Sequence, residues 1–128
     1  MTDLAAAPAP LRVLLVDPDE CVRESLAGLL GIGRRCMVIG SAGTADGAVN
    51  LAAETAPDVV VVDPRLPGVD GAALIARLRA VAPGSRVLVL NWSETADLTS
   101  GADSYVRKTF RPHELIDAVI ATTRRSLA

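Results

Sequence analysis

The stretch Val59-Val60-Val61-Val62-Asp63-Pro64-Arg65-Leu66-Pro67 decides the fold. Four consecutive β-branched apolar residues are typical of a strand buried on both faces, because a half-buried strand would alternate apolar and polar residues. Such strands occur in parallel sheets that helices cover on both sides. The proline-rich segment that follows ends the strand in a turn and leaves a carboxylate, Asp63, just beyond it.

Four further apolar runs predict the remaining strands. They lie at Arg12–Val16, Met37–Ile39, Val87–Leu90 and, more weakly, Ser104–Val106. Segments with helical periodicity separate these runs. Strands that alternate with helices predict an α/β fold with a doubly wound, five-stranded parallel sheet.

Four segments place apolar residues at helical spacing. Thr44 and Asp70 are positioned to cap the second and third helices, and Pro112 suits the first turn of the last. In Asn91–Gly101 only Ala96 and Leu98 could face a core, so a helix there would have about two turns at most. We therefore expect the fourth helix of the fold to be shortened or irregular. The apolar positions of the other helices are Val22, Leu26, Leu29 and Leu30; Ala45, Ala48, Ala52 and Thr55; Leu74, Leu78 and Val81; and Leu115, Ile116, Val119, Ile120 and Thr123.

The composition fits one small domain. The chain has 128 residues, of which 50% are hydrophobic and 22% charged, with a formal net charge of −2. This charge disfavours non-specific binding to nucleic acid or anionic lipid. No apolar run approaches the roughly 18 residues of a membrane span, and no signal peptide opens the chain. We expect a cytoplasmic protein with no membrane attachment, in which residues 1–10 form a disordered lead-in and residues 11–126 form the domain.

Local signals predict the surroundings of several polar residues. Asp17-Pro18-Asp19-Glu20 fits a capping box for the first helix, with Asp17 as N-cap, Pro18 at the first helical position and Glu20 at the third. Cys21 and Cys36 lack metal or redox spacing and are expected to be buried thiols in a reducing compartment. The single histidine, His113, is expected at the surface.

Polar residues follow four of the predicted strands. These residues are Asp17, Asp63, Asn91 and Lys108. Because ligands bind beyond the carboxyl ends of parallel strands, we expect these side chains to meet at one edge of the sheet. Two adjacent carboxylates need a cation, which Lys108 or a divalent metal would supply. A lysine there could also hold a phosphoryl oxygen.

Four segments of the chain resemble the receiver domains of bacterial two-component response regulators, the CheY-like family. They are Val13-Leu-Leu-Val-Asp17, Val61–Gly71, Gly101-Ala-Asp-Ser-Tyr-Val-Arg-Lys108 and Pro112-His-Glu-Leu115. The resemblance covers about residues 11–126. It implies a sheet in flavodoxin-like order and transfer of a phosphoryl group from a sensor histidine kinase.

The resemblance also implies roles for individual residues. Asp63 would be the phosphoacceptor and Lys108 the family's invariant lysine. Mg²⁺ would be held by Asp63, by Asp17, directly or through water, and by the backbone carbonyl of Arg65. Tyr105 would be the switch aromatic, whose ring moves when the site is filled.

Four features depart from the family pattern. Pro18 replaces the second acidic residue, which weakens Mg²⁺ binding because proline offers no carboxylate. Asn91 replaces a hydroxyl residue that holds the phosphoryl oxygen, and Trp92 replaces a small residue beside the pocket. The Asn91–Gly101 stretch is shorter than usual by more than a helical turn, which alters part of the signalling and dimerisation face.

Two functions from different classes remain open. The first is a non-enzymatic phosphoacceptor switch that works with a histidine kinase, with a homodimer and a C-terminal DNA-binding effector as further expected partners. The alternative is a degenerate receiver that acts as an interaction or dimerisation module without phosphorylation. Asp17-x-Asp19 also resembles the acidic pair of haloacid dehalogenases, but the chain offers neither a cap domain nor an acidic pair after its fourth strand.

Overall fold

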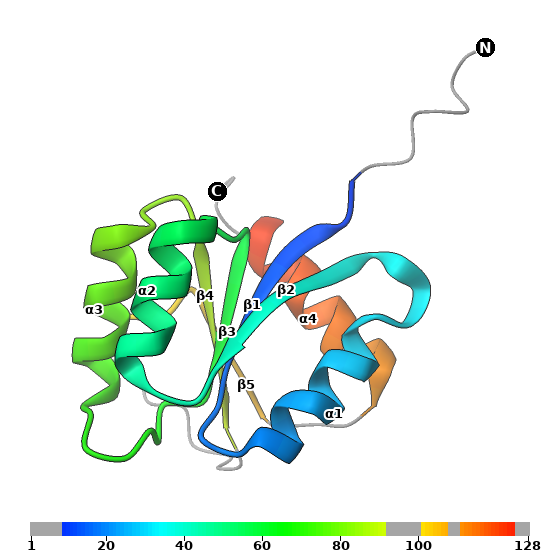
Figure 1. Ribbon diagram of the computed structural model, residues 1–128. Coiled ribbons are helices and arrows are strands. Elements are labelled where there is room, and N and C mark those ends of the chain that lie inside the picture. Colours follow the sequence, from blue (N-terminus) through cyan, green and yellow to red (C-terminus); the bar gives the residue numbers. More distant parts are fainter. Residues whose placement is uncertain (1–8, 92–100, 108–110, 125–128) are drawn as a thin grey trace.

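A five-stranded parallel sheet in the order β2-β1-β3-β4-β5 forms the centre of the protein (Figure 1). The computed structural model describes residues 9–91, 101–107 and 111–124, and of residue 91 only the backbone. The strands are β1 Leu11–Val16, β2 Cys36–Ala42, β3 Val59–Val62, β4 Arg86–Asn91 and β5 Ser104–Arg107. The helices are α1 Glu20–Leu30, α2 Ala45–Thr55, α3 Gly71–Val81 and α4 Pro112–Arg124, with a short 3₁₀ turn η2 at Ile32–Arg34. The flavodoxin-like strand order that the family resemblance implies is confirmed.

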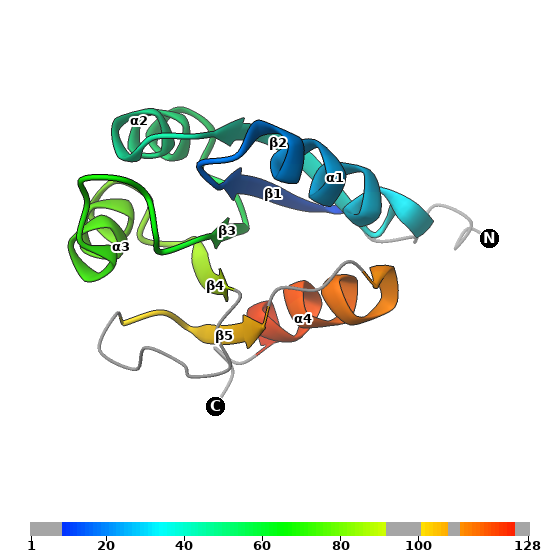
Figure 2. The ribbon, with the colours of Figure 1, turned by 90° about the horizontal axis from the view of Figure 1, so that it is seen from below.

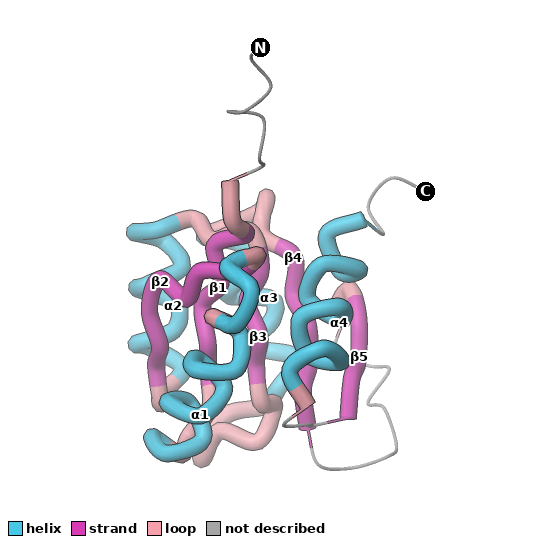
Figure 3. The backbone as a smooth tube through the Cα atoms, turned by 90° about the vertical axis from the view of Figure 1, so that its right-hand side faces the viewer, coloured by secondary structure: helices cyan, strands magenta, loops and turns pink. Residues whose placement is uncertain are grey.

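Helices cover both faces of the sheet, as the valine run predicts. α2 and α3 lie on one face and α1 and α4 on the other (Figure 2). Viewed from the α1 and α4 side, the strands run behind these two helices (Figure 3). Because successive side chains of a strand point to opposite faces, Val60 and Val62 join the α2–α3 core while Val59 and Val61 join the other.

The predicted strand that differs most from the structure is β2, which has seven residues and extends beyond Met37–Ile39 to Ala42. Its second half is built from small residues, so apolar β-branched content could not reveal it. These residues are strand because they pair with β1, where Leu14 lies opposite Gly40 and Val16 lies opposite Ala42. A register shift between Val13 and Leu14 accompanies this pairing.

The predicted capping box of α1 is wrong. The N-cap is Asp19, whose carboxylate accepts hydrogen bonds from the backbone N–H groups of Cys21 and Val22. Asp17 instead remains with the end of β1, where its backbone N–H donates to the Ala42 carbonyl at 3.1 Å. Thr44 and Asp70 cap α2 and α3 as predicted.

The two cysteines differ in burial. Cys36 is buried, as expected, but Cys21 is exposed. At 100° per residue, Cys21 lies about 140° around the helix from the buried Leu26, so it faces solvent.

Val81 at the end of α3 is also 39% exposed rather than part of the core. His113 is exposed as predicted.

Several expectations lie outside the described residues. They include most of the lead-in at residues 1–10 and the shortened fourth helix within residues 92–100. None of the helices in the described part of the chain is long and apolar enough to span a bilayer.

Candidate functional site

Two buried carboxylates lie side by side at the carboxyl edge of the sheet. β1 and β3 are neighbours, with Val16 opposite Val62, so the residues that follow them are also neighbours. The backbone N–H of Asp63 donates to the Val16 carbonyl at 2.8 Å. Asp17 and Asp63 are each only 3% exposed. Burial of a charged group is unfavourable without compensating partners, so this edge is the strongest candidate for a functional site.

Asp17 is held by hydrogen bonds through its backbone N–H, its side chain and its carbonyl oxygen. Its backbone N–H donates to Ala42 of β2. Its carboxylate oxygen Oδ1 accepts from the Asp19 backbone N–H at 2.9 Å. Its carbonyl oxygen accepts from Nη1 of Arg23 at 2.7 Å. The β1–α1 connection therefore fixes the direction in which this carboxylate points.

Asp63 is held from the turn that follows it. Its Oδ1 accepts from the backbone N–H of Arg65 at 2.8 Å. The Nε of Arg65 lies 3.4 Å from the same oxygen, which makes an ion pair. The Arg65 side chain is 59% exposed, so its guanidinium reaches the buried carboxylate from the solvent side.

The β3–α3 turn is anchored rather than open. Leu66 is 3% exposed and packs into the core beneath α2 and α3. Gly68 has φ of 73°, a left-handed conformation that glycine adopts without the penalty of a Cβ atom. Asp70 then accepts from the Ala73 N–H and starts α3. The Asp63 to Asp70 segment is thus fixed at both ends and in its middle.

The other predicted site residues are only partly located. Asn91 is the last residue of β4, and its backbone is paired with that of Arg107, the last residue of β5. Its position at the same edge of the sheet follows from this register, although the structure does not describe its side chain. Lys108, the next residue after β5, and Trp92 lie outside the described residues.

Tyr105, the predicted switch aromatic, is the second residue of β5. It is half-buried on β5, opposite Val89, and packs against the core that α2 and α3 share.

The donor set of the pocket fits Mg²⁺ with a small number of protein ligands. Within residues 9–91, 101–107 and 111–124, no cluster of three or more His, Cys, Asp or Glu residues could hold a metal. Asp17 and Asp63 are the two buried carboxylates that could offer oxygen ligands, and Pro18 has no carboxylate to add a third. Mg²⁺ usually binds through one or two carboxylates and keeps several waters, so two carboxylates suffice.

Sequence reasoning missed two guanidinium groups. The family resemblance gives a role to the backbone carbonyl of Arg65 but none to its side chain, which contacts Asp63. No motif in the sequence indicates a role for Arg23. Its spacing of six residues from Asp17 offered a weak signal, since a helix that starts near Asp19 turns Arg23 back toward the strand end.

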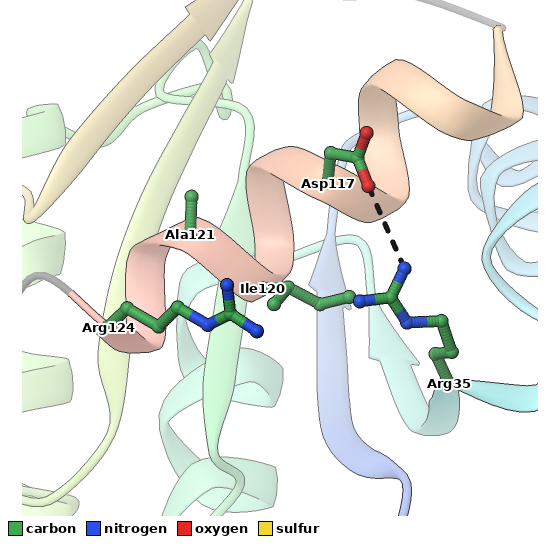
Figure 4. A pocket seen from close by; sticks show the side chains of 5 residues that line it. All are labelled: Arg35, Asp117, Ile120, Ala121 and Arg124. Carbon is green, nitrogen blue, oxygen red and sulfur yellow. Dashed lines mark ion pairs between the residues drawn. The ribbon is translucent and has the colours of Figure 1, made fainter.

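A separate pocket of 360 Å³ lies between α4 and the residue that precedes β2. Figure 4 shows the side chains that line it. Arg35, the residue before β2, pairs with Asp117 of α4 at 3.8 Å, and both side chains are more than half exposed. Nothing in this pocket resembles the buried acidic pair. The residues that line it are Arg35, Asp117, Ile120, Ala121 and Arg124.

Comparison with known proteins identifies the family. Residues 13–120 match the family of response regulator receiver domains. The chain is 34% identical over 122 residues to the response regulator MprA of Mycobacterium sp. (strain KMS), which covers 91% of this chain and 52% of MprA. It is 39% identical over 120 residues to the DNA-binding response regulator MtrA of Mycolicibacterium smegmatis, covering 90% of this chain and 51% of MtrA. The chain therefore spans about half the length of these relatives.

A solved structure supports the same assignment. The two-component response regulator of the LuxR family from Aurantimonas sp. SI85-9A1 superposes with a TM-score of 0.81 and 31% identity. The match covers 90% of this chain and 86% of that one. The sequence matches and the shared fold agree with the acidic pair at the sheet edge: the chain belongs to the family of response regulator receiver domains.

Proposed function

We propose that Asp63 accepts a phosphoryl group from a phosphohistidine of a sensor histidine kinase and that this switches the signalling face of the domain. The observation that carries the proposal is the buried pair of Asp17 and Asp63, each 3% exposed at the ends of adjacent strands. A strand end in a parallel sheet is where ligands of this architecture bind. The turn that follows Asp63 fixes its carboxylate at this edge.

The transfer is a nucleophilic substitution at phosphorus. An oxygen of the Asp63 carboxylate attacks the phosphorus, the bond from phosphorus to the histidine nitrogen breaks, and that nitrogen keeps the electron pair. Negative charge then gathers on the phosphoryl oxygens beside two carboxylates. Positioning and neutralisation of this charge are what the protein must provide.

Receiver domains generally bind Mg²⁺ in an acidic pocket, and we assign that role here to Asp17, Asp63 and the backbone carbonyl of Arg65. When bound, the ion would neutralise charge on the phosphoryl oxygens and on the two carboxylates. Lys108 would hold a phosphoryl oxygen as a point charge, and the amide of Asn91 would donate a hydrogen bond to another. Tyr105 and Trp92 would report the filled site to the neighbouring surface.

The partners of the chain follow from this role. Response regulators interact with histidine kinases and often act through a C-terminal DNA-binding effector. For this chain we propose a histidine kinase as donor, a homodimer as one output, and an effector joined to or contacted by residues 11–126 as another. Receiver domains are typically non-enzymatic signalling modules, and we propose the same here, in the cytoplasm.

Acetyl phosphate with Mg²⁺, followed by intact-mass analysis, tests the proposal. The wild-type chain should gain the mass of one phosphoryl group, and Asp63→Asn should not. Asp70→Asn is a matched control, because Asp70 lies in the same loop and asparagine also caps a helix well. It should gain the phosphoryl mass as the wild type does.

The degenerate-receiver alternative predicts different results. Wild type and Asp63→Asn would then show no difference in mass gain, and Mg²⁺ would leave the fluorescence of Trp92 unchanged. Saturable quenching of Trp92 by Mg²⁺, together with an Asp63-dependent mass gain, would exclude it.

A further inference from the structure

We infer that Arg23 is a positioning residue for Asp17. Gly43, which has no side chain, leaves the space that the Arg23 guanidinium occupies. This inference rests on the proposed function, because it concerns how Asp17 is presented to Mg²⁺. Arg23 lies on the second turn of α1, and its Nη1 donates to the carbonyl oxygen of Asp17 at 2.7 Å. The contact joins the helix to the strand end that it follows.

Gly43 makes room for this guanidinium. A Cβ atom built on Gly43 would lie 2.7 Å from Nη1 of Arg23 and 3.5 Å from its Cζ. It would also lie 3.6 Å from the carbonyl oxygen of Asp17. The backbone that follows β2 therefore approaches the Arg23 guanidinium so closely that only glycine fits without displacement.

The arrangement is not optimal for stability, which points to a functional reason for it. The Nε of Arg23 is buried and has no hydrogen-bond partner among the described residues. An unsatisfied buried donor disfavours the folded state, and such groups are uncommon in native proteins. A shorter or apolar side chain would avoid this penalty but could not reach the Asp17 carbonyl.

The position of Asp17 matters more here than in a pocket with an additional acid. Pro18 offers no carboxylate, so Asp17 is the only acid of the β1–α1 connection that is buried at the site. Its backbone N–H is tied to Ala42 and its Oδ1 to the Asp19 N–H. Arg23 completes this set by fixing the carbonyl, so the peptide plane between Asp17 and Pro18 cannot rotate and the carboxylate keeps its direction.

Two substitutions separate positioning from charge. Arg23→Gln removes a positive charge near the pocket, which by Coulomb's law alone would strengthen Mg²⁺ binding. Gly43→Ala keeps the charge and only displaces the guanidinium. If Arg23 acts by positioning, both variants weaken Mg²⁺ binding, by about 10- to 100-fold as is usual for residues that orient metal ligands. The double variant should bind Mg²⁺ no more weakly than either single variant, because both substitutions remove the same contact between Arg23 and Asp17.

The experiment is a Mg²⁺ titration of the full chain, monitored by calorimetry or by Trp92 fluorescence. Hydrogen exchange of the backbone amides, measured without Mg²⁺, is a second and metal-free readout. Gly28→Ala is the control, since nothing lies within 4 Å of a Cβ at that position of α1. It should bind Mg²⁺ as the wild type does. Without Mg²⁺, Arg23→Gln and Gly43→Ala should speed exchange of the Asp19 amide proton, which is bonded to Asp17, while the amides of β3 stay protected.

The outcomes distinguish the inference from the proposed function. If the wild type binds Mg²⁺ and both variants bind it equally well, or if Arg23→Gln binds it more tightly, the inference is overturned and the proposed function stands. If the wild type binds no Mg²⁺ at all, the proposed metal site and this inference are both overturned. Loss of protection throughout the sheet in both variants would show a purely structural role and would also overturn the inference.

Discussion

The backbone N–H of Asp63 donates to the carbonyl oxygen of Val16 at 2.8 Å, which ties the proposed phosphoacceptor to the strand that carries Asp17. Each residue belongs to a strand end, and the bond fixes the distance between those ends. The acidic pair is therefore a property of the sheet rather than of a loop. Substitutions that leave the sheet intact should therefore leave Asp17 and Asp63 side by side.

Substitutions at Asp19 and Asp17 should have different effects, the first on stability and the second on Mg²⁺ binding. Asp19→Ala removes the N-cap of α1 and should lower the free energy of unfolding by about 1 kcal/mol, without loss of phosphorylation. Asp17→Ala should weaken Mg²⁺ binding and slow phosphorylation. Urea unfolding and Mg²⁺ titration measure the two effects, and Asp19→Asn, which also caps, is the control. Loss of phosphorylation in Asp19→Ala, with the fold retained, would refute this division.

Arg65 should compete with Mg²⁺ for Asp63. Its guanidinium is half-exposed and only 3.4 Å from Oδ1 of Asp63. Arg65→Gln should therefore tighten Mg²⁺ binding. Because the Arg65 side of the pair faces solvent, the gain should stay close to the value of about 1 kcal/mol that bounds surface ion pairs, which is about fivefold in affinity. The gain should shrink at high ionic strength.

Arg77→Gln is the matched control for Arg65. Arg77 is similarly exposed, but it pairs with Asp46 at 2.9 Å rather than with Asp63. Its loss should leave Mg²⁺ affinity unchanged. Equal tightening in both variants would mean that net charge, not the contact with Asp63, controls the affinity.

Asp103 should be a stability centre at the other end of the sheet. Its Oδ2 accepts from the Val87 backbone N–H at 2.7 Å and from Arg79 at 3.1 Å. Asp103→Ala removes the side-chain partner of both groups and should lower the free energy of unfolding by about 1.5–3 kcal/mol, as for other hydrogen bonds to charged groups. Asp117→Ala, which breaks an exposed pair at 3.8 Å, should change it by less than about 1 kcal/mol. Similar losses in urea unfolding would contradict this prediction.

The two thiols should differ in reactivity, because Cys21 is exposed and Cys36 is buried. Burial raises the pKa of the Cys36 thiol, an effect that the neighbouring Arg35 only partly opposes. A thiol reagent should modify Cys21 quickly in the folded chain and Cys36 only after unfolding. Cys21→Ser should abolish the fast phase, and a fast phase that persists in this variant would overturn the assignment.

The raised pKa also predicts a direction for stability. The thiol of Cys36 ionises at a lower pH in the unfolded chain than in the folded one. Its contribution to stability is therefore fully present below the unfolded pKa and is lost as the pH rises through the raised, folded value. Cys36→Ser should flatten the alkaline end of a plot of stability against pH.

The fold could be predicted from sequence because its strongest signals are local. The run Val59–Val62 and the apolar spacing of the helices require no knowledge of partners. β2 was underestimated because Gly40, Ser41 and Ala42 become strand only by pairing with β1. Cys21 is exposed because its angle on α1 turns it away from the core, which a lack of metal or redox spacing does not reveal.

The site was predicted in its residues but not in its geometry. Asp17 and Asp63 follow buried strands, and this topological position could be read directly. The capping box failed because Asp17 and Asp19 both suit an N-cap, and only the pairing of Asp17 with Ala42 decides between them. The contact of Arg23 with Gly43 joins residues 20 positions apart and depends on backbone proximity, for which the sequence carries no periodic signal.

The most direct test of the account is to identify which residue carries the acyl phosphate. After treatment with acetyl phosphate and Mg²⁺, reduction with borohydride converts an aspartyl phosphate to homoserine, and peptide mapping by mass spectrometry locates it. The account predicts homoserine at position 63, in the peptide that contains Pro64 and Arg65, and none in Asp63→Asn. Homoserine at another aspartate, or none in the wild-type chain, would contradict it.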